Sequence, residues 1–184
     1  MLNQYVKNQF SLIYKPTVGA DFLTKSIQKG DSTINLQLWD TAGAERYHSI
    51  GSGFYRNSET CVLVFDLTTP ESFTNLEGWR REFLDNLSPP EGEKFPFVLL
   101  GNKSDIKEEI KVKNEDIEKF CKEHNDMPYF SVSAKSGENV EESFLKVADL
   151  AFERNTQNDD MPLPEIKPIH VQRVEPKKKC CGGF

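Results

Sequence analysis

The first 153 residues alternate between continuous apolar runs and segments in which apolar side chains recur at helical spacing. Cys61–Leu67 and Phe97–Gly101 are runs of apolar and β-branched residues, a pattern typical of strands buried on both faces. Tyr129–Ser133 predicts a third, shorter strand. Because helical segments separate these strands, we predict an α/β fold with a mostly parallel sheet and helices on both faces.

Three segments carry the helical spacing. The first begins at Thr69, a favoured N-cap residue that is followed by a first-turn proline. Asn114–Glu123 predicts the second helix, and Asn139–Glu153 predicts the third. Asn139 is the expected N-cap of the third helix, with Glu142 in the capping-box position. The inward positions are Phe73, Leu76, Phe83, Leu84 and Leu87 in the first helix and Ile117, Phe120 and Cys121 in the second.

The N-terminal part of the chain predicts a β-hairpin. Ala20–Gln28 and Thr33–Asp40 read as strands, and Lys29-Gly30-Asp31 between them is a turn signal. Two large aromatic residues, Phe22 and Trp39, fall on the otherwise polar faces of these strands. Either a neighbouring helix or loop covers these two side chains, or they form an exposed apolar patch that binds a partner.

Composition and charge narrow the classes of function. Hydrophobic residues make up 37% and charged residues 28% of the 184, as in a globular domain. The apolar runs are too short to cross a bilayer, and the net charge of −6 argues against general nucleic-acid binding. From Arg154 onward, four prolines punctuate a polar stretch. We therefore predict one folded domain at residues 1–153 and a flexible tail at residues 154–184.

Three polar motifs follow three of the predicted strands. They are Asp40-Thr41-Ala42-Gly43, Asn102-Lys103-Ser104-Asp105 and Ser133-Ala134-Lys135. Taken singly, such residues are more often turn or cap residues. In open α/β sheets, however, ligands bind beyond the carboxyl ends of the strands, so the joint placement of the motifs predicts a ligand site.

The chemistry of these motifs favours a guanine nucleotide. An ionised Asp105 only accepts hydrogen bonds, and guanine offers it two adjacent donors, N1–H and the 2-amino group. Adenine lacks this pair, and sites built on such bonds reject the wrong analogue by about 10⁴–10⁵. The stem of Lys103 can lie along the base, and a backbone N–H near Ala134 can meet guanine O6. Asp40 and Gly43 suit a magnesium ion and a γ-phosphate.

These motifs resemble the magnesium-side and base-side motifs of Ras-like small GTPases. The sequences of Gly19–Lys25 and Phe95–Asp105 resemble those of the late-endosomal and lysosomal branch of the Rab subfamily. Further segments similar to Rab signatures are Val18-Gly19-Ala20-Asp21-Phe22, Leu38–Gly43, Phe54-Tyr55-Arg56 and Leu63–Thr68. The resemblance covers roughly residues 1–152 and implies a Ras-like P-loop NTPase fold that binds GTP or GDP with Mg²⁺.

The resemblance also assigns roles to individual residues. Thr17 and Asp40 are expected to ligate Mg²⁺, and Phe22, Trp39 and Tyr55 match the aromatic triad through which Rab proteins engage effectors. The residues expected to contact the nucleotide are Tyr14, Thr17, Gly43, Asn102, Lys103, Asp105, Ser133, Ala134 and Lys135.

The sequence departs from the family pattern at the phosphate-binding loop. No Gly-x-x-x-x-Gly-Lys-Ser/Thr motif occurs, although that loop cradles the phosphates in the family. It precedes the helix that Met1–Lys7 resembles, together with a strand that lies between those matching Thr33–Asp40 and Cys61–Leu67. We therefore expect an N-terminally truncated copy, through a misplaced start or a shortened transcript, that binds GTP weakly or folds poorly with its first strand missing.

A second departure is Ala44, which stands where the family commonly has the glutamine that orients the attacking water. A methyl group cannot orient water, so we expect slow unaided hydrolysis and assign no catalytic residue. Whether the chain is an enzyme therefore stays open. The alternative is that Ala44 simply tolerates a mobile loop.

The C-terminal residues predict membrane attachment. Cys180 and Cys181 are adjacent and follow the basic run Lys177-Lys178-Lys179. Paired terminal cysteines resemble the double geranylgeranylation site of Rab proteins; two lipids anchor stably where one is marginal, and the lysines add attraction to anionic lipids. The alternative is a solvated tail with two idle thiols.

The sequence as a whole predicts a GTP/GDP switch in vesicle traffic from late endosomes to lysosomes. It would be lipid-anchored on the cytoplasmic face of these membranes, with a cytosolic pool. The implied partners are effectors, an exchange factor, a GTPase-activating protein, a prenylation escort and a GDP-dissociation inhibitor, and not nucleic acid. The alternatives are a prenylated adaptor that binds partners without nucleotide and a non-functional transcript product.

Overall fold

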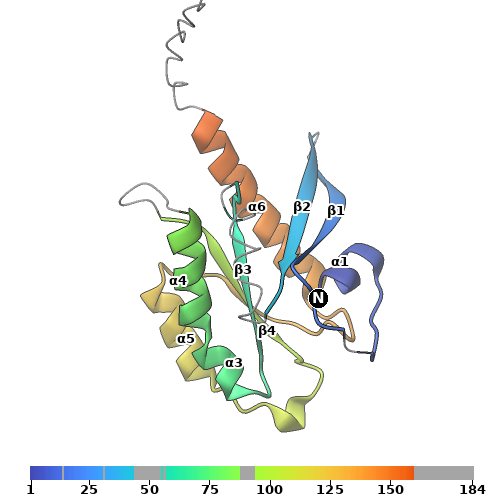
Figure 1. The fold of residues 1–184 in the computed structure, drawn as a ribbon, viewed down its shortest axis with the longest axis vertical. Helices are drawn as coiled ribbons and strands as arrows, with labels where there is room; N and C mark the ends of the chain where they lie inside the picture. Colours follow the sequence, from blue (N-terminus) through green and yellow to red (C-terminus); the bar gives the residue numbers. More distant parts are fainter. Residues whose placement is uncertain (14, 31, 44–54, 56, 88–93, 160–184) are drawn as a thin grey trace, which may run out of the picture.

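A parallel sheet with helices on both faces forms the centre of the protein (Figure 1). The computed structural model describes residues 1–13, 15–30, 32–43, 55, 57–87 and 94–159. The sheet contains β3 (Cys61–Asp66), β4 (Phe97–Asn102) and β5 (Tyr129–Ser131), in the order β3-β4-β5 and all parallel. The continuous apolar runs in the sequence are therefore buried strands, and the predicted mostly parallel α/β fold is confirmed.

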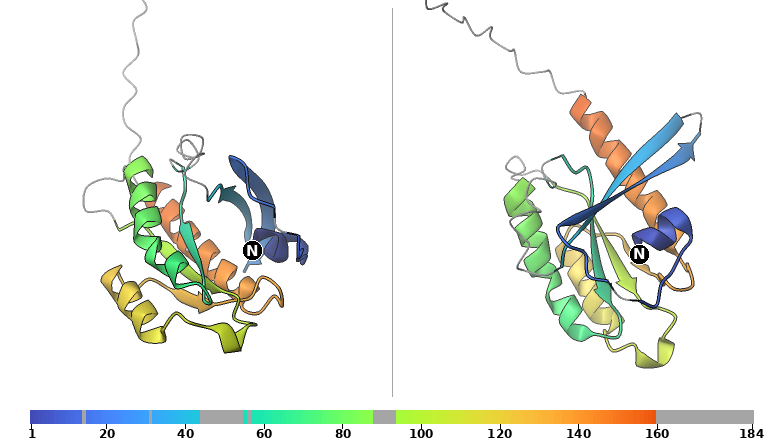
Figure 2. Two further views of the ribbon diagram at one scale, coloured as in Figure 1. Left: turned by 60° about the horizontal axis from the view of Figure 1, so that its bottom comes forward. Right: turned by 45° about the vertical axis from the view of Figure 1, so that its right-hand side comes forward.

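Helices cover the two faces of this sheet separately (Figures 1 and 2). On one face lie α3 (Pro70–Thr74), α4 (Leu76–Leu87) and α5 (Asn114–Glu123). The other face is covered by α1 (Leu2–Lys7) and α6 (Val140–Asp159). None of these helices is both long and apolar enough for a membrane crossing.

The N-terminal hairpin forms as predicted. It consists of β1 (Ala20–Lys29) and β2 (Ser32–Thr41), paired antiparallel so that Lys29 lies opposite Ser32. Only two residues remain for the turn, and Gly30 adopts a positive φ of 59° there, which glycine does without steric cost.

The hairpin and the parallel sheet are separate sheets. Within the part of the chain that the structure describes, β2 pairs only with β1, and β3 pairs only with β4. The expectation that these two strand edges lack a shared neighbour therefore agrees with the observed pairing. A short 3-10 helix, η2 (Lys107–Glu109), follows β4.

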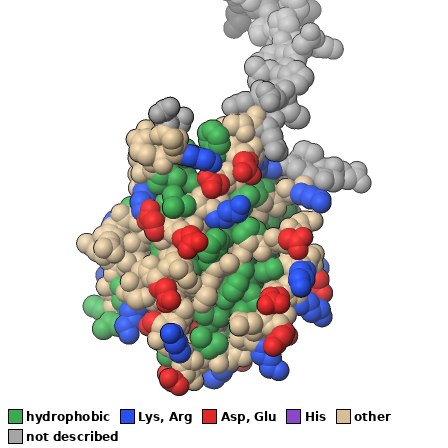
Figure 3. Space-filling model, turned by 180° about the vertical axis from the view of Figure 1, so that it is seen from behind, with side chains coloured by type: hydrophobic (Ala, Val, Ile, Leu, Met, Phe, Trp, Pro, Cys, Tyr) green, Lys and Arg blue, Asp and Glu red, His purple; other side chains and the backbone are tan. Residues whose placement is uncertain are grey.

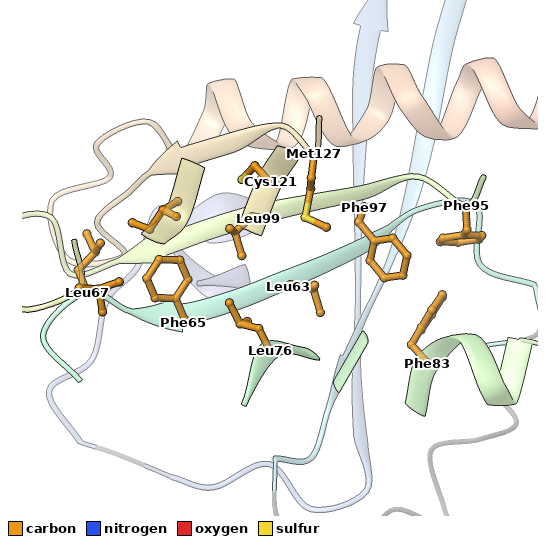
Figure 4. Packing of buried hydrophobic residues seen from close by; sticks show 12 residues of the cluster. Leu63, Phe65, Leu67, Leu76, Phe83, Phe95, Phe97, Leu99, Cys121 and Met127 are labelled. Atoms are coloured by element: carbon orange, nitrogen blue, oxygen red, sulfur yellow. The ribbon is translucent and has the colours of Figure 1, made fainter. Parts of the chain in front are cut away.

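Two apolar cores form because adjacent residues of β4 point to opposite faces. Phe97 and Leu99 belong to the first core, which lies beneath α3, α4 and α5. Figure 4 shows the rings of Phe83, Phe95 and Phe97 gathered at one end of this core, with centroids 5.0–5.6 Å apart. The second core packs β2, α1 and α6 over the opposite face, and its members from the two sheets are Leu36, Leu38, Val98 and Leu100.

The first predicted helix and the strand predicted at Tyr129–Ser133 differ from the structure. The helix predicted to start at Thr69 is divided at Asn75 into α3 and α4; asparagine competes for backbone hydrogen bonds and is a poor helix former. The Thr69 hydroxyl donates to Asp66 at 3.2 Å and forms no side-chain cap. The strand predicted to end at Ser133 ends at Ser131, where the chain turns into the loop that precedes α6.

The start and end of the third helix also differ from the prediction. Asn139 does not have the extended conformation of an ordinary N-cap: its φ is 55°, and its side-chain amide donates to the Ser131 carbonyl at 2.8 Å. It thus links the end of β5 to α6. The helix continues to Asp159, beyond the predicted boundary at Glu153. The Arg154 guanidinium lies 3.3 Å from the Glu59 carboxylate and connects this part of α6 to the segment before β3.

Candidate functional site

The ends of β4 and β5 are joined by side chains from the second and third motifs. The Asn102 side-chain oxygen accepts a hydrogen bond of 3.0 Å from the backbone N–H of Ala134. The structure thus brings these two motifs together at the carboxyl edge of the parallel sheet, as the sequence predicts. The Ala134 N–H itself is engaged by Asn102, whereas the predicted donor to guanine O6 is a backbone N–H near Ala134.

Ser133 organises the loop around Asp105. The buried Ser133 hydroxyl donates to the Asp105 carboxylate at 2.7 Å. The same oxygen accepts backbone N–H bonds from Lys135 at 3.2 Å and from Ser136 at 3.0 Å. The hydrogen bond from Ser133 lowers the pKa of Asp105, and the Lys135 ammonium, 3.7 Å from the carboxylate, adds to this effect. Asp105 is therefore an ionised acceptor at neutral pH.

Two acidic residues that the sequence analysis did not single out support this site. The Asp66 carboxylate lies 2.7 Å from the Lys103 ammonium, and the Glu138 carboxylate accepts a 2.9 Å hydrogen bond from Ser104. Burial alone would raise the pKa of Asp66, but hydrogen bonds from Lys103 and Thr68 outweigh burial and lower it. The sequence signal for a role of Asp66 is its position as the polar residue at the end of a third strand. In the sheet register it lies directly opposite Asn102.

The backbone of Lys103 adopts an unusual conformation for this contact. Its φ is 71°, in the left-handed region that residues with a side chain rarely occupy. Such conformations persist where surrounding contacts hold them. Here the Lys103 carbonyl accepts a hydrogen bond of 3.1 Å from the Ile106 N–H, and the Ser104 N–H donates to the Val132 carbonyl at 3.1 Å.

The first motif contacts the loop that precedes the hairpin. The Thr17 hydroxyl donates to the Asp40 carboxylate at 3.1 Å, and the Ala42 N–H donates to the Gly19 carbonyl at 2.9 Å. Thr17 and Asp40 thus lie close enough to share one cation. Hydroxyl and carboxylate oxygens suit Mg²⁺, which takes few protein ligands and completes its shell with phosphate and water. Among the described residues, no cluster of three or more His, Cys, Asp or Glu side chains could hold a metal.

The hairpin brings two of the three predicted partner-binding aromatics together. Phe22 lies opposite Trp39 in the β1–β2 register, with ring centroids 4.6 Å apart and each residue 43% exposed. Tyr55 is half-buried: its ring packs 5.2 Å from Phe83, and its side chain hydrogen-bonds with Thr41.

On the face seen in Figure 3, acidic and basic side chains are interspersed.

Several predicted site residues lie outside the part of the chain that the structure describes. These are Tyr14, Ala44, Cys180 and Cys181, together with the basic run at residues 177–179. Gly43 is described and ends the segment that follows β2.

Comparison with known proteins identifies the family. The sequence profile described as the Ras family matches residues 1–153. Ypt/Rab-type GTPase ypt7 of Schizosaccharomyces pombe is 46% identical over 181 residues, which covers 98% of this chain and 88% of that protein. Ras-related protein Rab7 of Drosophila melanogaster is 48% identical over 153 residues, or 83% of this chain and 73% of that protein. RABG3f of Arabidopsis thaliana is 46% identical over 182 residues, covering 98% and 88% of the two chains.

The chain therefore belongs to the Ras family of small GTPases. Its similarity to ypt7 and Rab7 confirms the predicted resemblance to the Rab subfamily and to its Rab7-like branch. The family implies that the ligands are GTP or GDP and Mg²⁺.

Proposed function

We propose that this protein is a guanine-nucleotide switch that recruits partner proteins in its GTP-bound state. The observation that carries the proposal is the Ser133–Asp105 hydrogen bond, which fixes an ionised carboxylate at the carboxyl edge of the sheet. An ionised carboxylate only accepts hydrogen bonds, so it pairs with the N1–H and 2-amino groups of guanine. Adenine would leave this carboxylate unpaired, which makes the site selective for guanine.

Lys103 completes the recognition of the base. Its ammonium is held by Asp66 at 2.7 Å, so its aliphatic stem is fixed and can pack along one face of the purine ring. Asn102 holds the Ala134 backbone in place beside the base. These contacts order the site before the nucleotide arrives, which reduces the entropy that is lost on binding.

At the phosphate end, Thr17 and Asp40 would hold Mg²⁺ beside the phosphates. When bound, the ion neutralises phosphate charge, and Thr17 couples its presence to the loop before the hairpin. The 184 residues contain no Gly-x-x-x-x-Gly-Lys motif. Base hydrogen bonds of about 0.5–1.5 kcal/mol each do not offset an association cost of roughly 4–15 kcal/mol. We infer that the base-side contacts supply the selectivity for guanine over adenine.

The test compares the affinities of the 184-residue chain for guanine and adenine nucleotides. Fluorescent GDP, GTP and ATP are titrated with Mg²⁺, and the guanine nucleotides are expected to bind more tightly than ATP. In the variant Asp105→Asn, the amide offers a donor where guanine also has one, whereas xanthine has a carbonyl at that position. The variant should therefore prefer xanthosine diphosphate, while the matched surface variant Asp116→Asn should not. Equal binding of GDP and ATP by the parent chain would contradict the proposal.

The cellular role follows from the relatives. We infer that the switch acts in late-endosomal or vacuolar traffic, because Rab7 and ypt7 are similar over most of the chain. Prenylation of Cys180 and Cys181 would anchor it to these membranes. Its partners would be effectors, an exchange factor, a GTPase-activating protein, a prenylation escort and a GDP-dissociation inhibitor.

A second candidate function is a prenylated adaptor that binds partners without nucleotide. The hairpin favours it, because the β1–β2 register by itself brings the exposed Phe22 and Trp39 rings together. Under this function, partner binding is unchanged in Asp105→Asn. Under the switch function, it weakens together with guanine-nucleotide binding.

A further inference from the structure

Lys25 of β1 contacts both helices that cover the second core. Its ammonium donates to the Tyr5 carbonyl at 2.9 Å and to the Glu141 carboxylate at 2.7 Å. It also lies 3.7 Å from the centroid of the Tyr5 ring, within the range of a cation–π contact. The Lys25 side chain is 23% exposed, so water screens these contacts only in part. One cation therefore joins the hairpin, α1 and α6.

The two groups that Lys25 binds lie at helix ends of opposite polarity. Tyr5 is in the last turn of α1, where backbone carbonyls have no partner within the helix. Glu141 is in the first turn of α6. Helix partial charges are negative at the C-terminus and positive at the N-terminus, so the ammonium suits the end of α1 and the carboxylate suits the start of α6. Figures 1 and 2 show α1 beside both the hairpin and the N-terminal half of α6.

α6 begins directly after the loop that carries the third motif, residues 133–139, which we call the base loop. Within it, the Ser133 N–H donates to the Glu138 carbonyl at 3.1 Å, and the Gly137 N–H donates to the Ser133 carbonyl at 2.9 Å. The N–H of Val140, the first residue of α6, donates to the Gly137 carbonyl at 3.2 Å. The conformation of the base loop therefore depends on where α6 begins.

α1 lies against the same loop. A Cβ atom on Gly137 would be 3.1 Å from the side-chain nitrogen of Gln4, so the two segments are closely packed there. Gly137 has a φ of 84°, which residues with a side chain rarely adopt. Gln4 precedes Tyr5, whose ring stacks on Phe144 of α6 with centroids 4.1 Å apart. The base loop thus contacts α1 and continues into α6, and these are the two helices that Lys25 joins.

A second lysine of the hairpin provides a matched comparison. The Lys29 ammonium lies 2.6 Å from the Asp149 carboxylate and 5.1 Å from the centroid of the Phe152 ring. Like Lys25, it attaches β1 to α6 through a carboxylate and lies near an aromatic ring. Asp149, however, is in the middle of α6, whereas Glu141 is in the first turn. The two lysines therefore differ chiefly in their distance along α6 from the base loop.

We propose that Lys25 is a positioning residue for the guanine base, which acts by holding α1 and the start of α6 in the arrangement that keeps the base loop closed. This inference rests on the proposed function, in which Ser133 of the base loop orients the carboxylate that meets guanine. Without the ammonium, the Tyr5 carbonyl and the Glu141 carboxylate lose a shared charge-assisted donor. The base loop then opens more often, and the base dissociates faster.

The first experiment measures amide hydrogen exchange in the 184-residue chain without nucleotide, because exchange reports local opening. The reporters are the amides of Ser133, Gly137 and Val140. In Lys25→Met they should exchange on the order of fivefold faster, as expected for loss of a partly exposed charge pair. The amides of β4 should keep their rates. In the matched variant Lys29→Met, the base loop should exchange as in the parent chain.

The second experiment measures the release of fluorescent GDP in stopped-flow displacement. Lys25→Met should release GDP on the order of fivefold faster than the parent chain, and Glu141→Gln should also accelerate release. The double variant should be no faster than Lys25→Met, because both substitutions remove the same interaction. Lys29→Met should release GDP at the parent rate. Circular dichroism establishes that each variant is folded, and Glu141→Gln suffices if Lys25→Met is not.

Four outcomes would overturn the proposal. The first is base-loop exchange that is unchanged in both Lys25→Met and Glu141→Gln. The second is equal acceleration in Lys29→Met, since attachment of the hairpin in general would then be responsible. The third is faster exchange of the β4 amides as well, which would indicate loosening of the whole domain. The fourth is faster base-loop exchange with an unchanged rate of GDP release.

Failure of the proposed function gives a different result. A parent chain that binds GDP and ATP equally would contradict the guanine-nucleotide switch. The hydrogen-exchange comparison needs no nucleotide, so it would still establish whether Lys25 holds the base loop.

Discussion

The ammonium of Lys103 lies 2.7 Å from the carboxylate of Asp66, so the base-binding motif after β4 is tied to the end of β3. This contact holds a lysine whose backbone is in the left-handed region. The candidate base-side site therefore draws on three adjacent strands: Asp66 ends β3, Asn102 ends β4 and Ser133 follows β5.

Replacing Asp66 should speed the dissociation of GDP without unfolding the protein. In Asp66→Asn the ion pair is lost, and partly exposed pairs of this kind contribute about 0.2–1 kcal/mol. Fluorescent GDP should dissociate about two- to fivefold faster in stopped-flow displacement, because 1.4 kcal/mol corresponds to a factor of ten. The control is Asp85→Asn on α4. An unchanged dissociation rate would mean that Asp66 has no part in positioning Lys103.

Acid should remove part of the stability of the protein. The pKa values of Asp66 and Asp105 are lowered from the usual 3.8 in the folded state. The unfolded chain therefore binds protons first as the pH falls, so these groups stabilise the fold fully above that value and lose their contribution as the pH drops through the folded pKa values. Urea unfolding between about pH 5 and pH 2 measures this loss. In the double variant Asp66→Asn/Asp105→Asn, the free energy of unfolding should depend less on pH; an identical pH profile would contradict the assignment.

Truncation of Phe144 should nearly unfold the domain. Phe144 is 1% exposed and its ring stacks on Tyr5 with centroids 4.1 Å apart, so it connects α6 to α1. Phe144→Ala should lower the free energy of unfolding by about 3–5 kcal/mol, a large fraction of the stability of a small domain. Phe152→Ala is the matched control on the same helix, since Phe152 is 41% exposed. A small effect in Phe144→Ala would show that the core refills around the cavity.

Loss of the exposed indole should strongly weaken partner binding at constant stability. Trp39 is 43% exposed and packs on Phe22, as expected for an aromatic anchor of an interface. In Trp39→Ala, affinity for an effector of a Rab7-type protein should fall by a factor of about thirty or more, which corresponds to 2 kcal/mol. Calorimetry provides the affinity and thermal unfolding the stability. Leu145→Ala, at a similarly exposed position on α6, should leave the affinity unchanged.

The two C-terminal cysteines should act together. In Cys180→Ser/Cys181→Ser, both proposed lipid attachment sites are removed, and the protein should move entirely from the membrane fraction to the cytosol. Each single variant should keep one lipid and show intermediate, reversible attachment, because one chain anchors only marginally. Cys121→Ser is the control within the folded domain. Membrane attachment that persists in the double variant would assign the anchor to another part of the protein.

The sequence predicted the strands well because they are continuous apolar runs. Val98, Leu99 and Leu100 admit no other arrangement than burial on both faces, and all three are 0% exposed. A hairpin turn around Gly30 also followed from local signals, although the predicted turn Lys29-Gly30-Asp31 is one residue longer than the observed pairing of Lys29 with Ser32 leaves. The meeting of the second and third motifs followed from the strand order, but the hydrogen bond between Asn102 and Ala134 was not predicted. The break at Asn75 was missed because apolar spacing alone does not record the poor helix propensity of asparagine. Other failures depended on tertiary contacts. The continuation of α6 to Asp159 leaves no distinct apolar spacing in the chain.

The roles of Asp66 and Glu138 were missed for the same reason. Each supports a motif residue from a different segment: Asp66 is far from Lys103 in the sequence, and Glu138 is far from Ser104. A single acidic residue at a strand end or in a loop is usually a turn residue. Only the parallel register, which places Asp66 beside Asn102, distinguishes it.

The helix α6 extends from the loop of the third motif to Asp159. It starts at Val140, just after Glu138 binds Ser104 of the base motif, and ends at Asp159, where the tail continues toward the paired cysteines. At 1.5 Å per residue, its 20 residues form a rod of about 30 Å. Under the proposed function, a protein that opens the base pocket would therefore approach one tip of that rod, whereas the lipid-bearing tail would leave from the other tip.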